Sequence, residues 1–175
     1  MRIIALLALP ALMALSACGG GADAYYADGT PVDFGPWKAD PIPALTQTAD
    51  GPMGYGDFQL VLNSVRTEHG LRELEENAKL NKASTDYARL MGQTAPLSHT
   101  GPDGSTPGDR ARAAGYDYSF IAENLARGFP SDESVIEAWL NSKTGHRENT
   151  LHERAEDFGL GRVGDNWVLM LGAEK

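Results

Sequence analysis

The unbroken apolar run Trp167–Leu171 is the feature that most constrains the fold of this chain. A short apolar run bounded by turn residues is typical of a strand buried on both faces. The turn sequence Gly164-Asp165-Asn166 stands before it, and further upstream Phe158 and Leu160 alternate with glycines in a second strand-like segment. Because helices must cover a strand of this kind, the sequence predicts a layered α/β sandwich.

Several upstream segments carry helical signals. Apolar residues recur in them at helical spacing, with Asp57, Thr106 and Ser131 as candidate N-caps and Gly70 and Gly92 as stops. We expect helices over 57–69, 80–91, 106–114 and from 131 past 139, a further helical turn over 145–151, and a strand or extended segment over 118–126.

Residues 1–17 have the features of a signal peptide. Arg2 is their only charge, and an apolar run too short to span a bilayer comfortably follows from Ile3 to Leu15. Small residues stand directly before Cys18, and Leu15-Ser16-Ala17-Cys18 resembles the bacterial lipobox, whose acylated cysteine becomes the first residue of the mature protein. We expect Cys18 to carry palmitate or similar chains and to anchor an exported lipoprotein to a membrane.

The alternative interpretation of this segment is an ordinary secretory signal beside an incidental cysteine. Cys18 is the only cysteine of the chain, so no internal disulfide can form. Residue 19 is glycine rather than aspartate. By resemblance to lipoprotein sorting in bacteria with two membranes, this favours the outer membrane, facing the periplasm.

Residues 18–56 are rich in proline and glycine without helical or strand periodicity, which predicts a flexible linker. Tyr25-Tyr26, Phe34 and Trp37 are unusual in a solvated tether and indicate that part of it docks on the domain.

The chain has a net charge of −9, which becomes −10 without the leader. Such an acidic surface repels phosphate backbones and argues against nucleic-acid binding. No glycine-rich phosphate loop indicates a nucleotide cofactor.

A set of short motifs over residues 57–173 resembles, in its order, the bacterial branch of the CAP (SCP-like) superfamily of extracellular proteins. The motifs are Asn63…Arg66, Gly70-Leu71, Leu97-Ser98-His99, Asp109-Arg110-Ala111…Ala114-Gly115-Tyr116, Ala122-Glu123-Asn124-Leu125, Trp139…Ser142, Gly145-His146-Arg147…Asn149-Thr150-Leu151 and Gly159-Leu160-Gly161. The resemblance makes residues 57–175 one CAP domain and implies a three-layer α-β-α sandwich.

The resemblance also implies a cleft lined by two histidines and two glutamates, which in some members holds a divalent metal. His99 matches the first histidine, Glu123 the first glutamate and His146 the second histidine. The second glutamate, three residues after Trp139 in the family, is replaced here by Ser142. The incomplete set argues against tight metal binding and leaves His99, Glu123, His146 and Ser142 as the ligand-binding candidates.

Spacing along the chain does not show whether these residues meet, because His99, Glu123 and His146 are separated by 24 and 23 residues and form no His-Glu-x-x-His helix. Folded together, two imidazoles and a carboxylate could hold Zn²⁺ with an open position and lower the pKa of its water to about 7. Without a metal, the same residues would form a hydrogen-bonded network in which Glu123 keeps a histidine charged.

The remaining notable residues have structural interpretations. They are His69 at a helix C-terminus, His152 on a solvated charged stretch, the pair Asp109-Arg110 as a local ion pair or cap, and Trp139 and Trp167 as core residues.

Three functions stay open. The first is a module that binds an envelope lipid, glycan or peptide in the cleft, with or without a divalent metal. The second is a metal-assisted hydrolase using His99, Glu123 and His146. The third is a structural envelope protein whose cleft is vestigial.

Overall fold

The computed structural model describes residues 25–26, 55–93 and 97–175. The predicted signal peptide, Cys18, Phe34 and Trp37 lie outside the described residues. Among the helices of the described ranges, none is both long enough and apolar enough to cross a bilayer.

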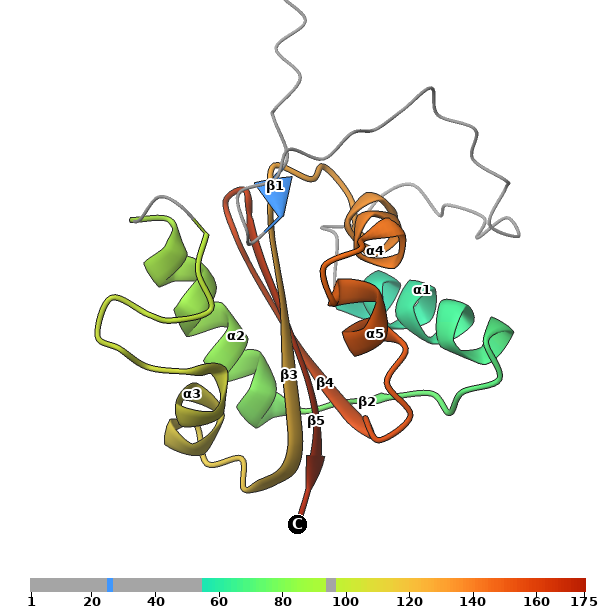
Figure 1. Cartoon of the computed structure of the whole chain (residues 1–175), viewed down its shortest axis with the longest axis horizontal. Helices are drawn as coiled ribbons and strands as arrows, with labels where there is room; N and C mark the ends of the chain where they lie inside the picture. Colours follow the sequence, from blue (N-terminus) through green and yellow to red (C-terminus); the bar gives the residue numbers. More distant parts are fainter. Residues whose placement is uncertain (1–24, 27–54, 94–96) are drawn as a thin grey trace, which may run out of the picture.

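A mixed five-stranded sheet forms the centre of the molecule, in the order β1-β3-β5-β4-β2 (Figure 1). The three long strands are antiparallel neighbours: β3 (Tyr118–Arg127), β5 (Asn166–Glu174) and β4 (Asp157–Val163). Two-residue strands extend both edges. β1 (Tyr25–Tyr26) pairs antiparallel with the end of β3, and β2 (Glu75–Glu76) pairs parallel with the start of β4.

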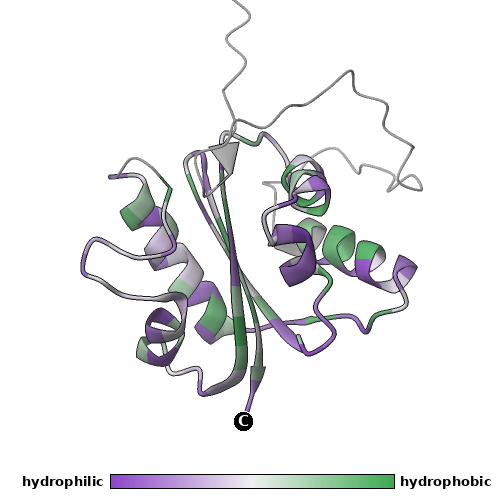
Figure 2. Cartoon of the chain, viewed as in Figure 1, coloured by the Kyte–Doolittle hydropathy of each residue, from purple (hydrophilic) through white to green (hydrophobic). Residues whose placement is uncertain are grey.

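Strand β5 is buried on both faces, as its apolar run predicts. Trp167, Leu169 and Leu171 belong to one core cluster, and the intervening Val168 and Met170 belong to the other. Each cluster is closed by its own helical layer, so the predicted three-layer sandwich is confirmed. Figure 2 shows apolar colouring along the strands and on parts of the helices beside them.

The first layer consists of α2 (Ala78–Met91) and α3 (Pro107–Ala113), left of the sheet in Figure 1. Asn77 caps α2 through its side chain. Thr106 caps α3 in a capping box with Asp109, and Pro107 stands at the first helical position. The predicted start of α3 is therefore confirmed. Asp109-Arg110 was expected to form a local ion pair or a cap, and Asp109 forms the cap.

The second layer consists of α1 (Tyr55–Glu68), α4 (Asp132–Asn141) and the short polar α5 (His146–Thr150) (Figures 1 and 2). Ser131 caps α4, as expected. The first helix begins at Tyr55, so Asp57 lies inside its first turn and not at the predicted cap. Gly70 adopts a φ of 72° after this helix, a conformation that favours glycine, and confirms the predicted stop.

Two glycines of β4 allow α2 to lie directly on the sheet. A Cβ on Gly159 would stand 2.2 Å from the backbone of Leu80, and one on Gly161 would stand 2.2 Å from the backbone of Ser84. The close approach also lets the Ser84 hydroxyl donate to Gly159 O at 2.9 Å. The alternating glycines of this strand are thus a requirement of helix packing.

Within the described residues, the segment before the domain pairs with it through β1. Tyr25 and Tyr26 of β1 pair with Arg127 and Ala126 of β3. This pairing agrees with the expectation that part of 18–56 docks, and it places a strand where the sequence indicated only a linker.

Candidate functional site

Strand β3 carries the central residue of the candidate site. Side chains alternate across a strand, so the neighbours Glu123 and Asn124 point to opposite faces of the sheet. Glu123 contacts Arg110 of α3 and His99 of the preceding loop, whereas Asn124 contacts α5. The side chain of Glu123 is only 1% exposed, so its charge needs partners from the protein.

The structure brings His99 and Glu123 together, as the family resemblance implies. His99 Nδ1 lies 2.8 Å from Glu123 Oε1. Because a carboxylate only accepts hydrogen bonds, Nδ1 carries the hydrogen and donates. The His99 side chain is 46% exposed, and its Nε2 makes no hydrogen bond within the described residues. Glu123 therefore fixes the tautomer and direction of a half-exposed imidazole.

Arg110 is the second partner of Glu123. Its Nη2 donates to Glu123 Oε2 at 2.7 Å and to His99 O at 3.0 Å, while Nη1 donates to Ser105 O at 2.8 Å. The guanidinium stacks on the Tyr87 ring, 3.5 Å from its centroid. The expected local ion pair of Arg110 with Asp109 is therefore wrong, because the side chain reaches across to β3.

Tyr87 supports the His99 loop from helix α2. Its hydroxyl donates to Ser98 O, the residue before His99. Burial raises the pKa of Tyr87, so the hydroxyl stays protonated and able to donate. Glu123 thus holds the ring of His99, Arg110 binds its carbonyl oxygen, and Tyr87 binds the carbonyl oxygen of the preceding Ser98.

His146 has a different set of partners. It is 3% exposed, and its Nδ1 lies 2.9 Å from Ser142 Oγ and 3.4 Å from Thr144 Oγ1. The Ser142 hydroxyl also accepts from Thr144 N at 3.2 Å. The residue that replaces the family glutamate therefore contacts His146 directly, four residues away in sequence.

A polar cluster on the other face of β3 positions helix α5. Asn124 Nδ2 donates to His146 O at 3.0 Å and to Thr150 Oγ1 at 2.9 Å, and Asn149 Nδ2 donates to Asn124 Oδ1 at 3.0 Å. The buried Arg66 of α1 donates to Thr150 O at 2.8 Å. These buried hydrogen bonds fix the helix that carries His146.

The donor set does not fit a divalent metal. Both oxygens of Glu123 are engaged by His99 and Arg110, and the guanidinium places a positive charge where a cation would have to bind. In the described part of the chain, which includes His99, Glu123 and His146, no three His, Cys, Asp or Glu side chains are grouped to hold a metal ion. The three-ligand zinc set that the sequence allowed is not formed.

Sequence reasoning missed three contributors to this site: Arg110, Tyr87 and Thr144. Arg110 stands beside Asp109 in sequence, which concealed its long-range partner. His152, expected to be solvated, instead stacks on Phe120 with ring centroids 4.2 Å apart. His69 lies at the end of α1 with Nδ1 2.8 Å from Val65 O, in agreement with its structural interpretation.

The sequence model of the CAP family, described as the cysteine-rich secretory protein family, matches residues 60–169. The chain belongs to the CAP family. The match covers β3, α3, α4 and α5 and therefore every residue of the candidate site. The comparison confirms the family that the motif order indicated.

Two bacterial proteins are similar to this chain in sequence. The uncharacterized protein YkwD of Bacillus subtilis is 32% identical over 108 residues, which span 61% of this chain and 42% of that protein. An uncharacterized protein of Borreliella burgdorferi is 28% identical over 116 residues, spanning 63% of this chain and 73% of that protein. The CAP domain thus corresponds to less than half of YkwD.

Solved structures share the CAP fold. An extracellular protein of Bacillus anthracis with an SCP domain has a TM-score of 0.64 at 24% identity, covering 72% of this chain and 45% of that one. An outer surface protein of Borrelia burgdorferi has a TM-score of 0.62 at 25% identity, covering 70% of this chain and 97% of that one. Such neighbours, together with the family, support an exported protein.

Proposed function

We propose that this protein is an exported lipoprotein whose CAP domain binds an envelope ligand at the His99–Glu123 pair. The observation that carries the proposal is the fixed, half-exposed imidazole of His99, with Nδ1 donating 2.8 Å to a buried carboxylate. A polar group held in one direction by buried partners is the usual means of orienting a ligand.

The chemistry of His99 Nε2 defines which ligand groups fit. The neutral ring accepts a hydrogen bond from a hydroxyl or amide, and the protonated ring donates to a carboxylate or phosphate. These groups belong to glycans, peptides and lipid headgroups. Ser142 and His146 form a second polar pair, which lies with α5 on the other face of β3 from the Glu123 side chain. The proposal therefore rests on the His99–Glu123 pair, and contact of the same ligand with His146 and Ser142 is an expectation from the family resemblance alone.

A titration of the purified protein, followed through the ring resonances of labelled histidines, tests this proposal. The probes are peptidoglycan glycan chains, peptidoglycan-derived peptides, and vesicles of phosphatidylethanolamine and phosphatidylglycerol. We expect one probe class to shift His99, and His99→Ala to weaken its binding at least about tenfold, or about 1.4 kcal/mol.

His69→Ala is the matched control, because the His69 ring contacts Val65 O and the Arg147 guanidinium rather than His99 or Glu123, and its loss should leave binding unchanged. Binding that is equal in His99→Ala and the unmodified protein would contradict the proposal. No binding of any probe would contradict it too and would favour the structural envelope function, with a vestigial cleft.

Hydrolysis is the second candidate function, favoured by the same His99–Glu123 contact. A carboxylate on Nδ1 orients an imidazole so that Nε2 can act as a general base. Glu123 does not fit a metal ligand here, so the donor set supports this metal-free form better than the metal-assisted one. Product formation from a bound probe, abolished by His99→Ala without loss of binding, would distinguish hydrolysis from simple binding.

We further propose that acylated Cys18 anchors the protein, with Gly19 favouring the outer membrane facing the periplasm. Cys18 is the only cysteine, so labelling with a palmitate analogue reports on one position. We expect labelling and membrane fractionation of the unmodified chain, and loss of both in Cys18→Ser. Labelling that persists in Cys18→Ser would contradict the anchor.

A further inference from the structure

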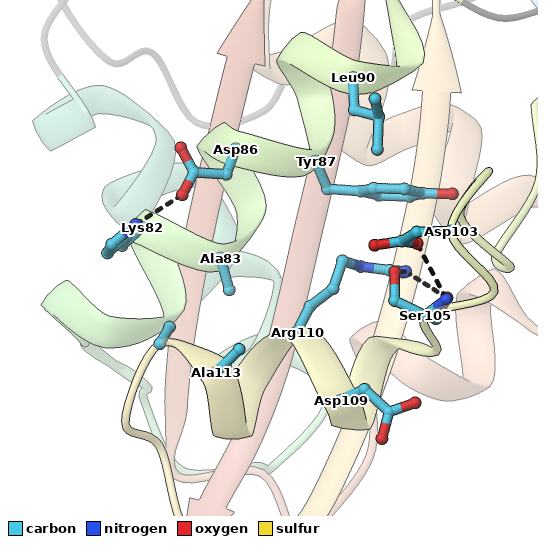
Figure 3. Close-up of a pocket in the computed structure, with 11 residues that line it drawn as sticks. Lys82, Ala83, Asp86, Tyr87, Leu90, Asp103, Ser105, Asp109, Arg110 and Ala113 are labelled. Carbon is cyan, nitrogen blue, oxygen red and sulfur yellow. Dashed lines mark hydrogen bonds and ion pairs between the residues drawn. The ribbon is translucent and has the colours of Figure 1, made fainter.

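A pocket of about 330 Å³ lies between α2 and α3 and the loop around Asp103, on the α2 side of the sheet (Figure 3). Its volume is at the small end of the range for ligand sites, suited to one amino-acid side chain with its backbone. The pocket shares Arg110 and Tyr87 with the candidate site, but neither His99, Glu123 nor His146 lines it. The pocket therefore needs its own explanation.

Apolar groups form much of the pocket wall. Ala83 and Leu90 contribute from α2, and Ala113 and the following Ala114 contribute from the C-terminal end of α3. The Tyr87 ring adds an aromatic surface. Ala113 is exposed, so a side chain there is not part of the core. A ligand with a short aliphatic chain would remove this apolar surface from water.

Most charged side chains around this pocket have an ion-pair partner, but Asp103 has none in the part of the chain that the structure describes. Lys82 and Arg89 both pair with Asp86, at 2.6 and 3.0 Å. Arg110 is neutralised by Glu123 at 2.7 Å. Asp109, which also lines the pocket, lies 3.8 Å from Arg112. Asp103 forms no ion pair within the described residues. Its Oδ1 accepts from Ser105 N at 2.9 Å, and hydrogen bonds from Ser105, with a smaller effect of the Arg110 charge, lower the pKa of its carboxyl. One fixed carboxylate with no salt-bridge partner thus faces the pocket.

Arg110 supplies an independent indication of a ligand. Its side chain is 10% exposed, and its Nε–H is buried with no hydrogen-bond acceptor among the described residues. Buried donors of this kind are rare because losing water without a replacement partner costs free energy. Arg110 lines the pocket, and a ligand carbonyl that reached this buried N–H would supply the absent acceptor.

We propose that this pocket binds a lysine-type side chain of a peptide. The aliphatic chain would lie against Ala83, Ala113 and Leu90, the ammonium would pair with Asp103, and a backbone carbonyl of the peptide would face Arg110. The pocket binds this ligand whether or not His99 binds another. Because Arg110 also contacts Glu123 and His99 O, occupancy should be visible at His99 as well.

Two matched probes test the role of the ammonium: Nα-acetyl-lysine methylamide and Nα-acetyl-norleucine methylamide, which replaces the ammonium with a methyl group. They are titrated into the purified protein while the methyl resonances of Ala83 and Ala113 are followed. We expect the lysine probe to bind at least about tenfold more tightly. Equal binding of the two probes, or no binding of either, would overturn the proposal.

Two variants test the position. Asp103→Asn should reduce lysine binding to the norleucine level, whereas Asp165→Asn, an exposed carboxylate in the β4–β5 turn, should change nothing. Ala113→Leu should fill the pocket and abolish binding of both probes. A lysine affinity unchanged in either pocket variant would overturn the proposal, and the dispersed amide spectrum of each variant confirms that it is folded.

Discussion

Arg110 Nη2 donates a hydrogen bond to Glu123 Oε2 across 2.7 Å, between side chains that are 10% and 1% exposed. The same guanidinium lies on the Tyr87 ring and binds Ser105 O. This buried pair therefore joins β3, α2 and α3, and its arginine also lines the α2–α3 pocket. Its removal should affect both stability and the orientation of His99.

Glu123→Ala should lower the free energy of unfolding by about 3–5 kcal/mol, because it leaves the Arg110 charge buried without its partner. Urea unfolding measures the effect. The matched control is Glu156→Ala, which breaks the ion pair between Glu156 and Arg72. Both of these side chains are more than half exposed, so the control should lower the free energy of unfolding by at most about 1 kcal/mol. Similar losses of unfolding free energy in the two variants would contradict the burial of the Arg110–Glu123 pair.

Gly161→Ala should destabilise the protein by about 3 kcal/mol or more, because the new methyl would overlap the backbone of α2 at Ser84. Gly164→Ala is the control. It adds a methyl in open space at a φ of 57°, so only backbone strain of about 1–2 kcal/mol is expected. Thermal unfolding compares the variants, and a smaller loss at Gly161 than at Gly164 would contradict the described packing of α2.

Alkaline pH should destabilise the domain through Tyr116. Burial raises the pKa of its hydroxyl, which donates to Asp157 Oδ2 at 2.6 Å. Because the folded-state pKa lies above the unfolded value of about 10, the contribution to stability is complete below that pH and is lost as pH rises through the folded value.

Urea midpoints measured between about pH 9 and pH 11 test this dependence. Tyr116→Phe should be less stable at neutral pH, since Asp157 loses its donor, and should lose less stability on alkaline titration. If the urea midpoint falls equally with pH in Tyr116→Phe and in the unmodified protein, a role for Tyr116 ionisation is contradicted.

Much of the fold was predictable because its signals are local. The apolar run of β5, the Thr106-Pro107 start of α3 and the Ser131 cap each depend on neighbouring residues. The start of α1 was wrong by two residues because Asp57 suits the first turn of a helix as well as a cap. The Tyr25–Tyr26 strand was not predictable, because it depends on pairing with a distant edge.

The site was predictable only in part. The motif order indicated His99 and Glu123 as site residues, and the structure brings their side chains into contact. Arg110 was misinterpreted because its nearest opposite charge in sequence is Asp109, whereas its position on α3 directs it to Glu123. No spacing rule reveals a contact between a helix and a strand on the same face of a sheet.

The tautomers of the histidine rings test the central claim most directly. His99 Nδ1 donates to Glu123, whereas His152 Nδ1 accepts from Arg154 N at 3.2 Å and so provides an internal reference of the opposite tautomer. Nitrogen-15 spectra of the labelled rings at a pH where both are neutral should show Nδ1–H for His99 and Nε2–H for His152. An Nε2–H tautomer at His99, unchanged by Glu123→Gln, would show that the carboxylate does not orient the ring.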